Sequence, residues 1–180
     1  GKTMDRPVRV LMVTSEAVPF AKVGGLGDVA GALPKELTGL GCEVATIMPF
    51  YSEVRGGDFE FERVIDEQSV MLGRQSIEVS VVRAITEDNQ QWYFIDAPKL
   101  YNRNEMYGHS DDLDRVTFFA QQALRTVYIL GWKPDIVHCH DWQSGLIPAY
   151  ISNPTELGSI HTADSFFRGI KTLYTIHNLA

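Results

Sequence analysis

Short apolar runs alternate with segments of helical periodicity along the chain. Residues 8–14 and 44–48 are near-continuously apolar, as in strands buried on both faces of a parallel sheet. Between them, apolar residues recur at helical spacing from Leu26 to Leu40, and Gly41 is a C-terminal stop. Pro34 lies inside this pattern and should kink or split the helix. The order strand, helix, strand predicts a parallel βαβ unit.

The remaining pattern predicts hairpin strands, a long helix and two further buried strands. Residues 77–81 alternate with period two and residues 92–95 are β-rich, which indicates strands, some antiparallel, added to the parallel sheet. The other expected elements are helices over 113–130 and 144–151, strands over 136–140 and 171–176, and loops over 97–111 and 152–169. We therefore predict an α/β, Rossmann-like domain over 1–180, with a mostly parallel sheet and helices on both faces.

Composition excludes several classes of partner. The formal net charge is −7 and no stretch collects Lys and Arg, which argues against binding nucleic acid by neutralising phosphates. No apolar run approaches the roughly 20 residues that span a bilayer, so we expect no membrane partner. Two cysteines without a CxxC motif, and no visible secretory signal, favour a reducing compartment. We expect the cytoplasm, or the plastid stroma in a plant.

A glycine cluster precedes the first predicted helix and is the first candidate for chemistry. Glycines at a helix N-terminus let backbone N–H groups approach an anion, and Lys22 could add a positive charge. The alternative is a tight turn. Gly25-x-Gly27-x-x-Ala30 matches a dinucleotide fingerprint literally, but about ten residues separate it from the strand, which argues against that class. We expect the loop 15–25 to be mobile.

Polar residues follow two predicted strands at the point where each ends. Asp141 follows residues 136–140, and His177 and Asn178 follow residues 171–176. Ligand sites of open α/β sheets lie at the carboxyl ends of strands, so these side chains should converge. His138 and His140 share one strand face and could hold a metal, but no further ligand stands at supporting spacing. The alternative is one buried structural histidine and one polar residue that ends the strand, and we predict no metal and no cofactor.

Two further features leave their roles open or favour structure. Asp112-x-Asp114 is literally an Asp-x-Asp metal motif, but it opens a predicted helix, where capping and the helix dipole explain it better. Tyr101 and Trp142 are packing or sugar-stacking residues, and the sequence does not choose between these roles.

Four motifs in order resemble those of bacterial glycogen synthases and plant starch synthases. They are Lys-Val-Gly-Gly-Leu-Gly-Asp-Val at 22–29, Asp-Ala-Pro-Lys-Leu-Tyr at 96–101, His-Cys-His-Asp-Trp at 138–142 and His-Asn-Leu-Ala at 177–180. Val23 departs from the Thr that is common in the family, without altering the named roles.

The resemblance implies the N-terminal, acceptor-side half of a glycosyltransferase-B fold, truncated before the donor-binding C-terminal domain. It also implies a hexosyltransferase activity without a metal: glucose passes from ADP-glucose or UDP-glucose to the non-reducing end of an α-1,4-glucan, with retention. ADP-glucose is the favoured donor. We expect the 180-residue chain alone to be inactive.

Carried over by motif, Lys22 would lie near the donor phosphate, Asp141 would contact the transferred glucose and His177 would hold a glucose hydroxyl. The remaining implied substrate-binding residues are Gly24 and Gly25, which allow close backbone approach, Asp28, which orders the loop, and Tyr101, which lines the acceptor side. Two other classes stay open: a stand-alone glucan- or nucleotide-binding module of the same fold, and a His-x-His metallohydrolase.

Overall fold

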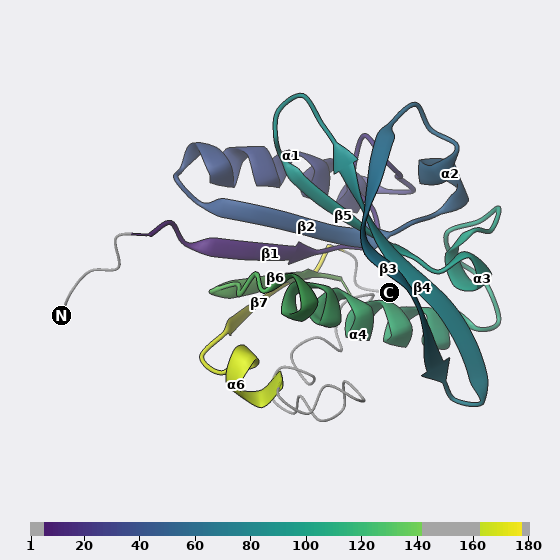
Figure 1. Ribbon diagram of the computed structural model, residues 1–180. Coiled ribbons are helices and arrows are strands. Elements are labelled where there is room, and N and C mark those ends of the chain that lie inside the picture. Colours follow the sequence, from purple (N-terminus) through teal and green to yellow (C-terminus); the bar gives the residue numbers. More distant parts are fainter. Residues whose placement is uncertain (1–5, 142–162, 178–180) are drawn as a thin grey trace.

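The computed structural model describes residues 6–141 and 163–177, and its strands form one mixed, mostly parallel sheet (Figure 1). The strand order across the described sheet is β3-β4-β5-β2-β1-β6-β7. The strands are β1 (Arg9–Val13), β2 (Glu43–Pro49), β3 (Glu60–Leu72), β4 (Gln75–Ile85), β5 (Gln91–Asp96), β6 (Ile136–His140) and β7 (Lys171–Thr175).

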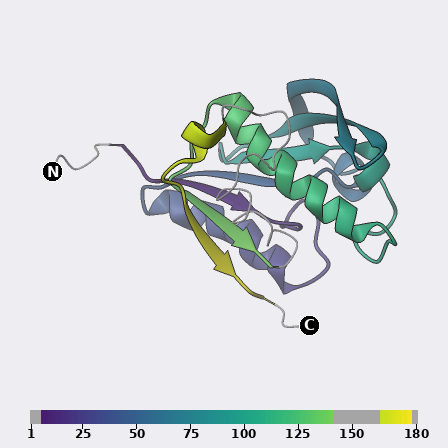
Figure 2. The ribbon, with the colours of Figure 1, turned by 90° about the horizontal axis from the view of Figure 1, so that it is seen from below.

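Helices cover both faces of this sheet, as the sequence predicted. Helix α1 (Gly25–Gly39) and helix α4 (Asp112–Leu130) lie on opposite faces (Figure 2). The shorter described helices are α2 (Ser52–Arg55), α3 (Pro98–Tyr101) and α6 (Ala163–Phe167). The last two stand where loops were expected. The helix predicted over 144–151 lies outside the described residues.

The centre of the sheet is the predicted parallel βαβ unit. β1 pairs in parallel with β2 on one side and with β6 on the other, and β6 pairs in parallel with β7. Leu11 and Met12 are both fully buried although they point to opposite faces, which explains the continuous apolar run. Pro34 is buried within α1 and does not split the helix, contrary to one expectation.

A long hairpin extends the sheet at one edge. β3 and β4 pair antiparallel, and β5 joins the hairpin to the parallel part because it pairs antiparallel with β4 and parallel with β2. The added antiparallel strands are therefore confirmed. The sequence did not reveal β3, since most residues of this strand are exposed and Ile65 alone among them is buried.

Candidate functional site

The carboxyl ends of β1, β6 and β7 lie at the same edge of the sheet, because these strands are parallel. Asp141 follows β6 and His177 follows β7. The backbone N–H of His177 donates to Oδ1 of Asp141 at 2.5 Å, and the backbone N–H of Asp141 donates to the carbonyl of Thr175 at 2.9 Å. The predicted convergence of these two residues is confirmed.

Asp141 itself has an unusual environment for a carboxylate. It is 3% exposed, and its φ of 56° places it in the left-handed region, where Asp is better tolerated than most residues. Such backbone conformations persist where the surrounding structure fixes them, and they cluster at functional sites. The contact with the chain at His177 provides that support here.

Three histidine rings lie next to one another beside Asp141. Nδ1 of His140 is 3.0 Å from Nε2 of His177, and Nε2 of His138 is 2.7 Å from Oγ1 of Thr175. Burial, together with the neighbouring histidines, lowers the pKa of His140 to about 3, and burial also lowers the pKa of His138. Both rings are therefore neutral near pH 7. Over residues 6–141 and 163–177, no group of three or more potential ligands is placed to hold a metal ion.

A buried carboxylate that the sequence analysis did not single out organises the glycine turn. Glu16 is 3% exposed, and its Oε1 accepts the backbone N–H of Gly24 at 3.0 Å and that of Gly27 at 2.9 Å. A carboxylate at a helix N-terminus is favoured by the helix dipole. Two of the amides that we expected to face an external anion therefore already bind the protein's own side chain. The only signal in the sequence was an acidic residue between a buried strand and the glycines.

Tyr107 links this turn to the strand ends. Its hydroxyl donates to Oε2 of Glu16 at 3.0 Å, and the Ser15 hydroxyl lies 2.7 Å from it. Burial raises the pKa of Tyr107, and the carboxylates of Glu16 and Asp141 raise it further. Tyr107 therefore stays protonated near pH 7 and can donate its hydrogen bond to Glu16. Of the two tyrosines in the 97–111 segment, the sequence analysis singled out Tyr101 and not Tyr107.

Lys22 and Asp28 form an exposed ion pair at the start of α1. Nζ of Lys22 lies 2.9 and 2.7 Å from the two carboxylate oxygens of Asp28. A Cβ added at Gly27 would lie 3.1 Å from the Lys22 side chain, so this position must stay small. A Cβ at Gly25 would meet no atom within 4 Å, so packing within the described chain does not require glycine there.

Tyr101 is a packing residue in this structure rather than an open sugar-binding surface. It is 2% exposed, and its hydroxyl donates to the carbonyl of Arg115 at 2.6 Å. Of the two roles that the sequence left open, the structure favours packing, and the expectation that Tyr101 lines an acceptor surface is not met. The reason is that α3 turns this side chain beneath α4.

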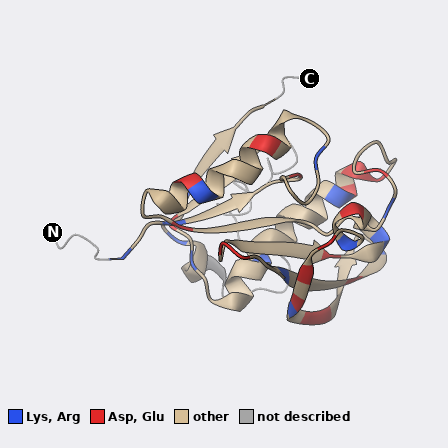
Figure 3. Cartoon of the chain, turned by 90° about the horizontal axis from the view of Figure 1, so that it is seen from above, with Lys and Arg blue, Asp and Glu red and all other residues tan. Residues whose placement is uncertain are grey.

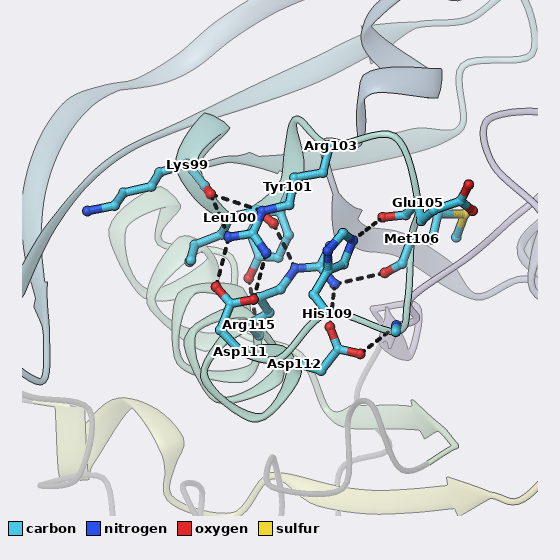
Figure 4. Close-up of polar contacts among 11 residues, drawn as sticks. Lys99, Leu100, Tyr101, Arg103, Glu105, Met106, His109, Asp111, Asp112 and Arg115 are labelled. Carbon is cyan, nitrogen blue, oxygen red and sulfur yellow. Dashed lines mark hydrogen bonds and ion pairs between the residues drawn. The ribbon is translucent and has the colours of Figure 1, made fainter.

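Arg115 in turn fixes the path of the 97–112 segment (Figure 4). Its Nε donates to the carbonyl of Leu100 at 2.7 Å, and its Nη1 donates to the carbonyl of Met106 at 2.9 Å and to Asp112 at 2.8 Å. Asp112 also accepts the backbone N–H of Gly108 at 2.7 Å, which confirms a structural role for the Asp112-x-Asp114 stretch at the start of α4. The segment that carries Tyr107 is thus held by a buried arginine.

Charged residues of both signs are spread over the described chain. Lys and Arg are scattered over several elements and interspersed with Asp and Glu (Figure 3). Among the described helices, none combines the length and apolar character needed to cross a membrane.

These features define a Rossmann-like α/β domain whose polar residues gather at the carboxyl ends of parallel strands, beside a glycine turn that opens a helix. Residues 9–180 match the family described as starch synthase catalytic domain, and the chain belongs to this family. The predicted fold class and family are confirmed. Trp142, which the matched range includes, lies outside the described residues.

Relatives and one solved structure support the same assignment. The chain is 39% identical over 173 residues to a glycogen synthase of Clostridium botulinum, covering 96% of this chain and 35% of that protein. It is 40% identical over 179 residues to a glycogen synthase of Moorella thermoacetica, with 98% and 34% covered. The catalytic domain of starch synthase IV from Arabidopsis thaliana, bound to ADP and acarbose, superposes with a TM-score of 0.82 at 27% identity, over 96% of this chain and 34% of that one. The chain spans about a third of the length of these relatives.

Proposed function

We propose that this chain is the acceptor-side domain of a glucosyltransferase that extends an α-1,4-glucan at its non-reducing end, with retention of configuration. The observation that carries the proposal is the direct contact between Asp141 and His177 at the carboxyl edge of the sheet, in a member of the starch synthase family. The Arabidopsis thaliana structure, which holds ADP and acarbose, supports a nucleotide-sugar donor and a glucan-like acceptor. We take ADP-glucose as the donor.

In this proposal Lys22 and the glycine turn serve the leaving diphosphate. A positive charge near a leaving phosphate stabilises the transition state more than the ground state. Lys22 is exposed, and within the described residues its ammonium group binds Asp28 alone, so it can exchange this partner for a phosphate. Gly25 leaves room for a ligand to approach the backbone, whereas the amides of Gly24 and Gly27 are already bound to Glu16.

Asp141 and His177 serve the transferred glucose. A sugar that passes through an oxocarbenium-like state is stabilised by nearby negative charge and by fixed contacts to its hydroxyls. The Asp141 carboxylate supplies the charge, and the half-buried His177 ring supplies a hydroxyl contact. The proposed reaction uses no metal and no cofactor. We also propose a cytoplasmic location, or the plastid stroma in a plant, in keeping with Cys42 and Cys139, which form no disulfide within the described residues.

The donor-binding groups belong, in this proposal, to a second domain beyond residue 180. Transfer requires both substrates to be held in one geometry, so the single domain should not turn over. The matched length, about a third of each relative, is consistent with this division.

The test uses Asp141→Asn and His177→Ala in the synthase that contains this domain. We expect kcat to fall by about 100-fold or more, the scale typical of one positioned polar group. Asp88→Asn is the control, because Asp88 lies on an exposed turn and is distant in sequence from Asp141 and His177; it should leave kcat unchanged. Near-normal turnover by folded His177→Ala would contradict the proposed role, and binding of maltoheptaose without any glucosyl transfer would favour the stand-alone binding module.

A further inference from the structure

His140, at the end of β6, contacts His177, which follows the neighbouring strand β7. His140 is fully buried at the end of β6, and its ring centroid lies 5.3 Å from that of His177, with the ring planes 21° apart. Nδ1 of His140 is 3.0 Å from Nε2 of His177. The pairing of β6 with β7 in parallel register, with His140 opposite Thr175, fixes this separation.

Two contacts together hold His177 by its backbone and by one ring nitrogen. Its backbone N–H is bound to Asp141 and its Nε2 to His140, while its Nδ1 makes no hydrogen bond to any residue of the described ranges. A hydrogen bond at one nitrogen of a neutral imidazole fixes how the ring is turned, and it ties the tautomer of His177 to whether Nδ1 of His140 donates or accepts. The occupied nitrogen is therefore Nε2, and Nδ1 is the nitrogen left for a ligand.

We propose that His140 is a positioning residue that locks His177 in one tautomer and one ring orientation, with Nδ1 of His177 presented to a sugar hydroxyl. The lowered pKa of His140 supports this role, because a neutral His140 neither repels a protonated neighbour nor changes its hydrogen-bonding capacity near pH 7. The identity of the ligand as a sugar rests on the proposed function, whereas the locked tautomer of His177 does not.

The first readout is the tautomer of His177, measured by ¹⁵N NMR of its ring nitrogens in the 180-residue chain. The unmodified chain should show one protonated and one unprotonated nitrogen with well-separated shifts. His140→Phe keeps a ring of similar size without a hydrogen bond, and His177 should then show averaged shifts. His140→Asn places an amide near the position of Nδ1 and should restore the single tautomer.

His138→Phe is the matched control, because it makes the same substitution on the same strand and face and removes the hydrogen bond with Thr175, while the contact between His140 and His177 stays in place. It should leave the His177 tautomer unchanged. In the synthase that contains this domain, His140→Phe should lower kcat by about 10-fold or more with little change in KM, as for residues that orient a contacting group, and His140→Asn should recover most of it.

Separated shifts of His177 in folded His140→Phe would overturn the proposal, as would equal effects of His140→Phe and His138→Phe. If His140→Phe does not fold, His140→Asn decides: a single tautomer supports the proposal and averaged shifts overturn it. A locked tautomer together with an inactive synthase would count against the proposed function alone.

Discussion

Replacing Glu16 tests the most buried charge near the glycine turn. Its carboxylate accepts hydrogen bonds from Gly24, Gly27 and Tyr107, and it is 3% exposed. After Glu16→Ala the N–H of Gly27 keeps the Gly24 carbonyl at 3.2 Å and the Tyr107 hydroxyl keeps the Ser15 hydroxyl at 2.7 Å, but each group loses a hydrogen bond to a charged acceptor, worth about 1.5–3 kcal/mol. The Gly24 amide is only half-buried and can reach water. We therefore expect a loss of roughly 3 kcal/mol in the free energy of unfolding, or on the order of 10 °C in Tm for a chain of this size.

Urea unfolding followed by tryptophan fluorescence measures this loss, provided that the m-value stays constant. Glu16→Gln keeps an acceptor for the glycine amides and should cost roughly 1 kcal/mol, since hydrogen bonds to neutral acceptors are weaker. Asp28→Ala is the matched control, because it removes a carboxylate from the same turn that is exposed and bound only to Lys22; we expect less than about 1 kcal/mol. A loss for Glu16→Ala no larger than that for Asp28→Ala would refute this account of the turn.

Three further predictions follow from the described contacts. Lys22→Ala should change the free energy of unfolding by less than about 1 kcal/mol, since its ion pair is exposed, yet it should lower kcat of the synthase that contains this domain. A drop in Tm large enough to explain the whole loss of turnover would refute the functional role. Gly31→Ala should destabilise the chain by about 1–3 kcal/mol, because the added Cβ would lie 2.3 Å from the Val18 carbonyl oxygen. A Cβ at Gly39 would meet no atom within 4 Å, so Gly39→Ala should stabilise α1 by about 0.5–1 kcal/mol. Urea midpoints that rank the two variants the other way would contradict this prediction. The folded-state pKa of His140 lies below its unfolded value, so the unfolded chain binds more protons between about pH 3 and 6.5, and the free energy of unfolding decreases as the pH is lowered through that window. His140→Asn should reduce the loss of stability between pH 7 and 5.5 by roughly 1 kcal/mol. An unchanged dependence of stability on pH would count against the buried neutral ring.

Periodicity revealed the elements whose burial is one-sided or complete. β1, β2, β6 and α4 were recovered because their apolar residues face the core, as the full burial of Leu11 and Phe118 shows. β3 was not recovered, since an exposed edge strand needs few apolar residues and its pairing with β4 supplies the order. The pairing of these two strands uses backbone hydrogen bonds, which a pattern of apolar side chains does not report.

Some residues of the candidate site could be predicted from the sequence, and others could not. Asp141 and His177 could be placed together because parallel strands align their carboxyl ends, and this requires only the strand order. Glu16 and Tyr107 could not, because 91 residues separate the two partners of one hydrogen bond. Tyr101 was left open for a related reason: whether an aromatic ring packs or lies open depends on α4, which folds over it.

The hydrogen bonds of the loop 15–25 argue against the mobility that we expected from the sequence. Adjacent glycines predicted mobility, but Ala21 donates to the carbonyl of Ala17 at 3.0 Å and Gly24 donates to Glu16. We now expect measurable protection of the Gly24 and Gly27 amides in hydrogen exchange, which Glu16→Ala should abolish. Rapid exchange of both amides in the unmodified chain would restore the original expectation.

Glucosyl transfer by the joined domains tests the central claim most directly. The 180-residue chain would replace the matching third of the Clostridium botulinum glycogen synthase, and incorporation of labelled glucose from ADP-glucose into glycogen would be measured. The joined protein should transfer glucose, its Asp141→Asn variant should transfer at least about 100-fold more slowly, and the isolated chain should not transfer. A folded, ADP-binding joined protein without transfer, or turnover by the isolated chain at rates normal for an enzyme, would contradict the account.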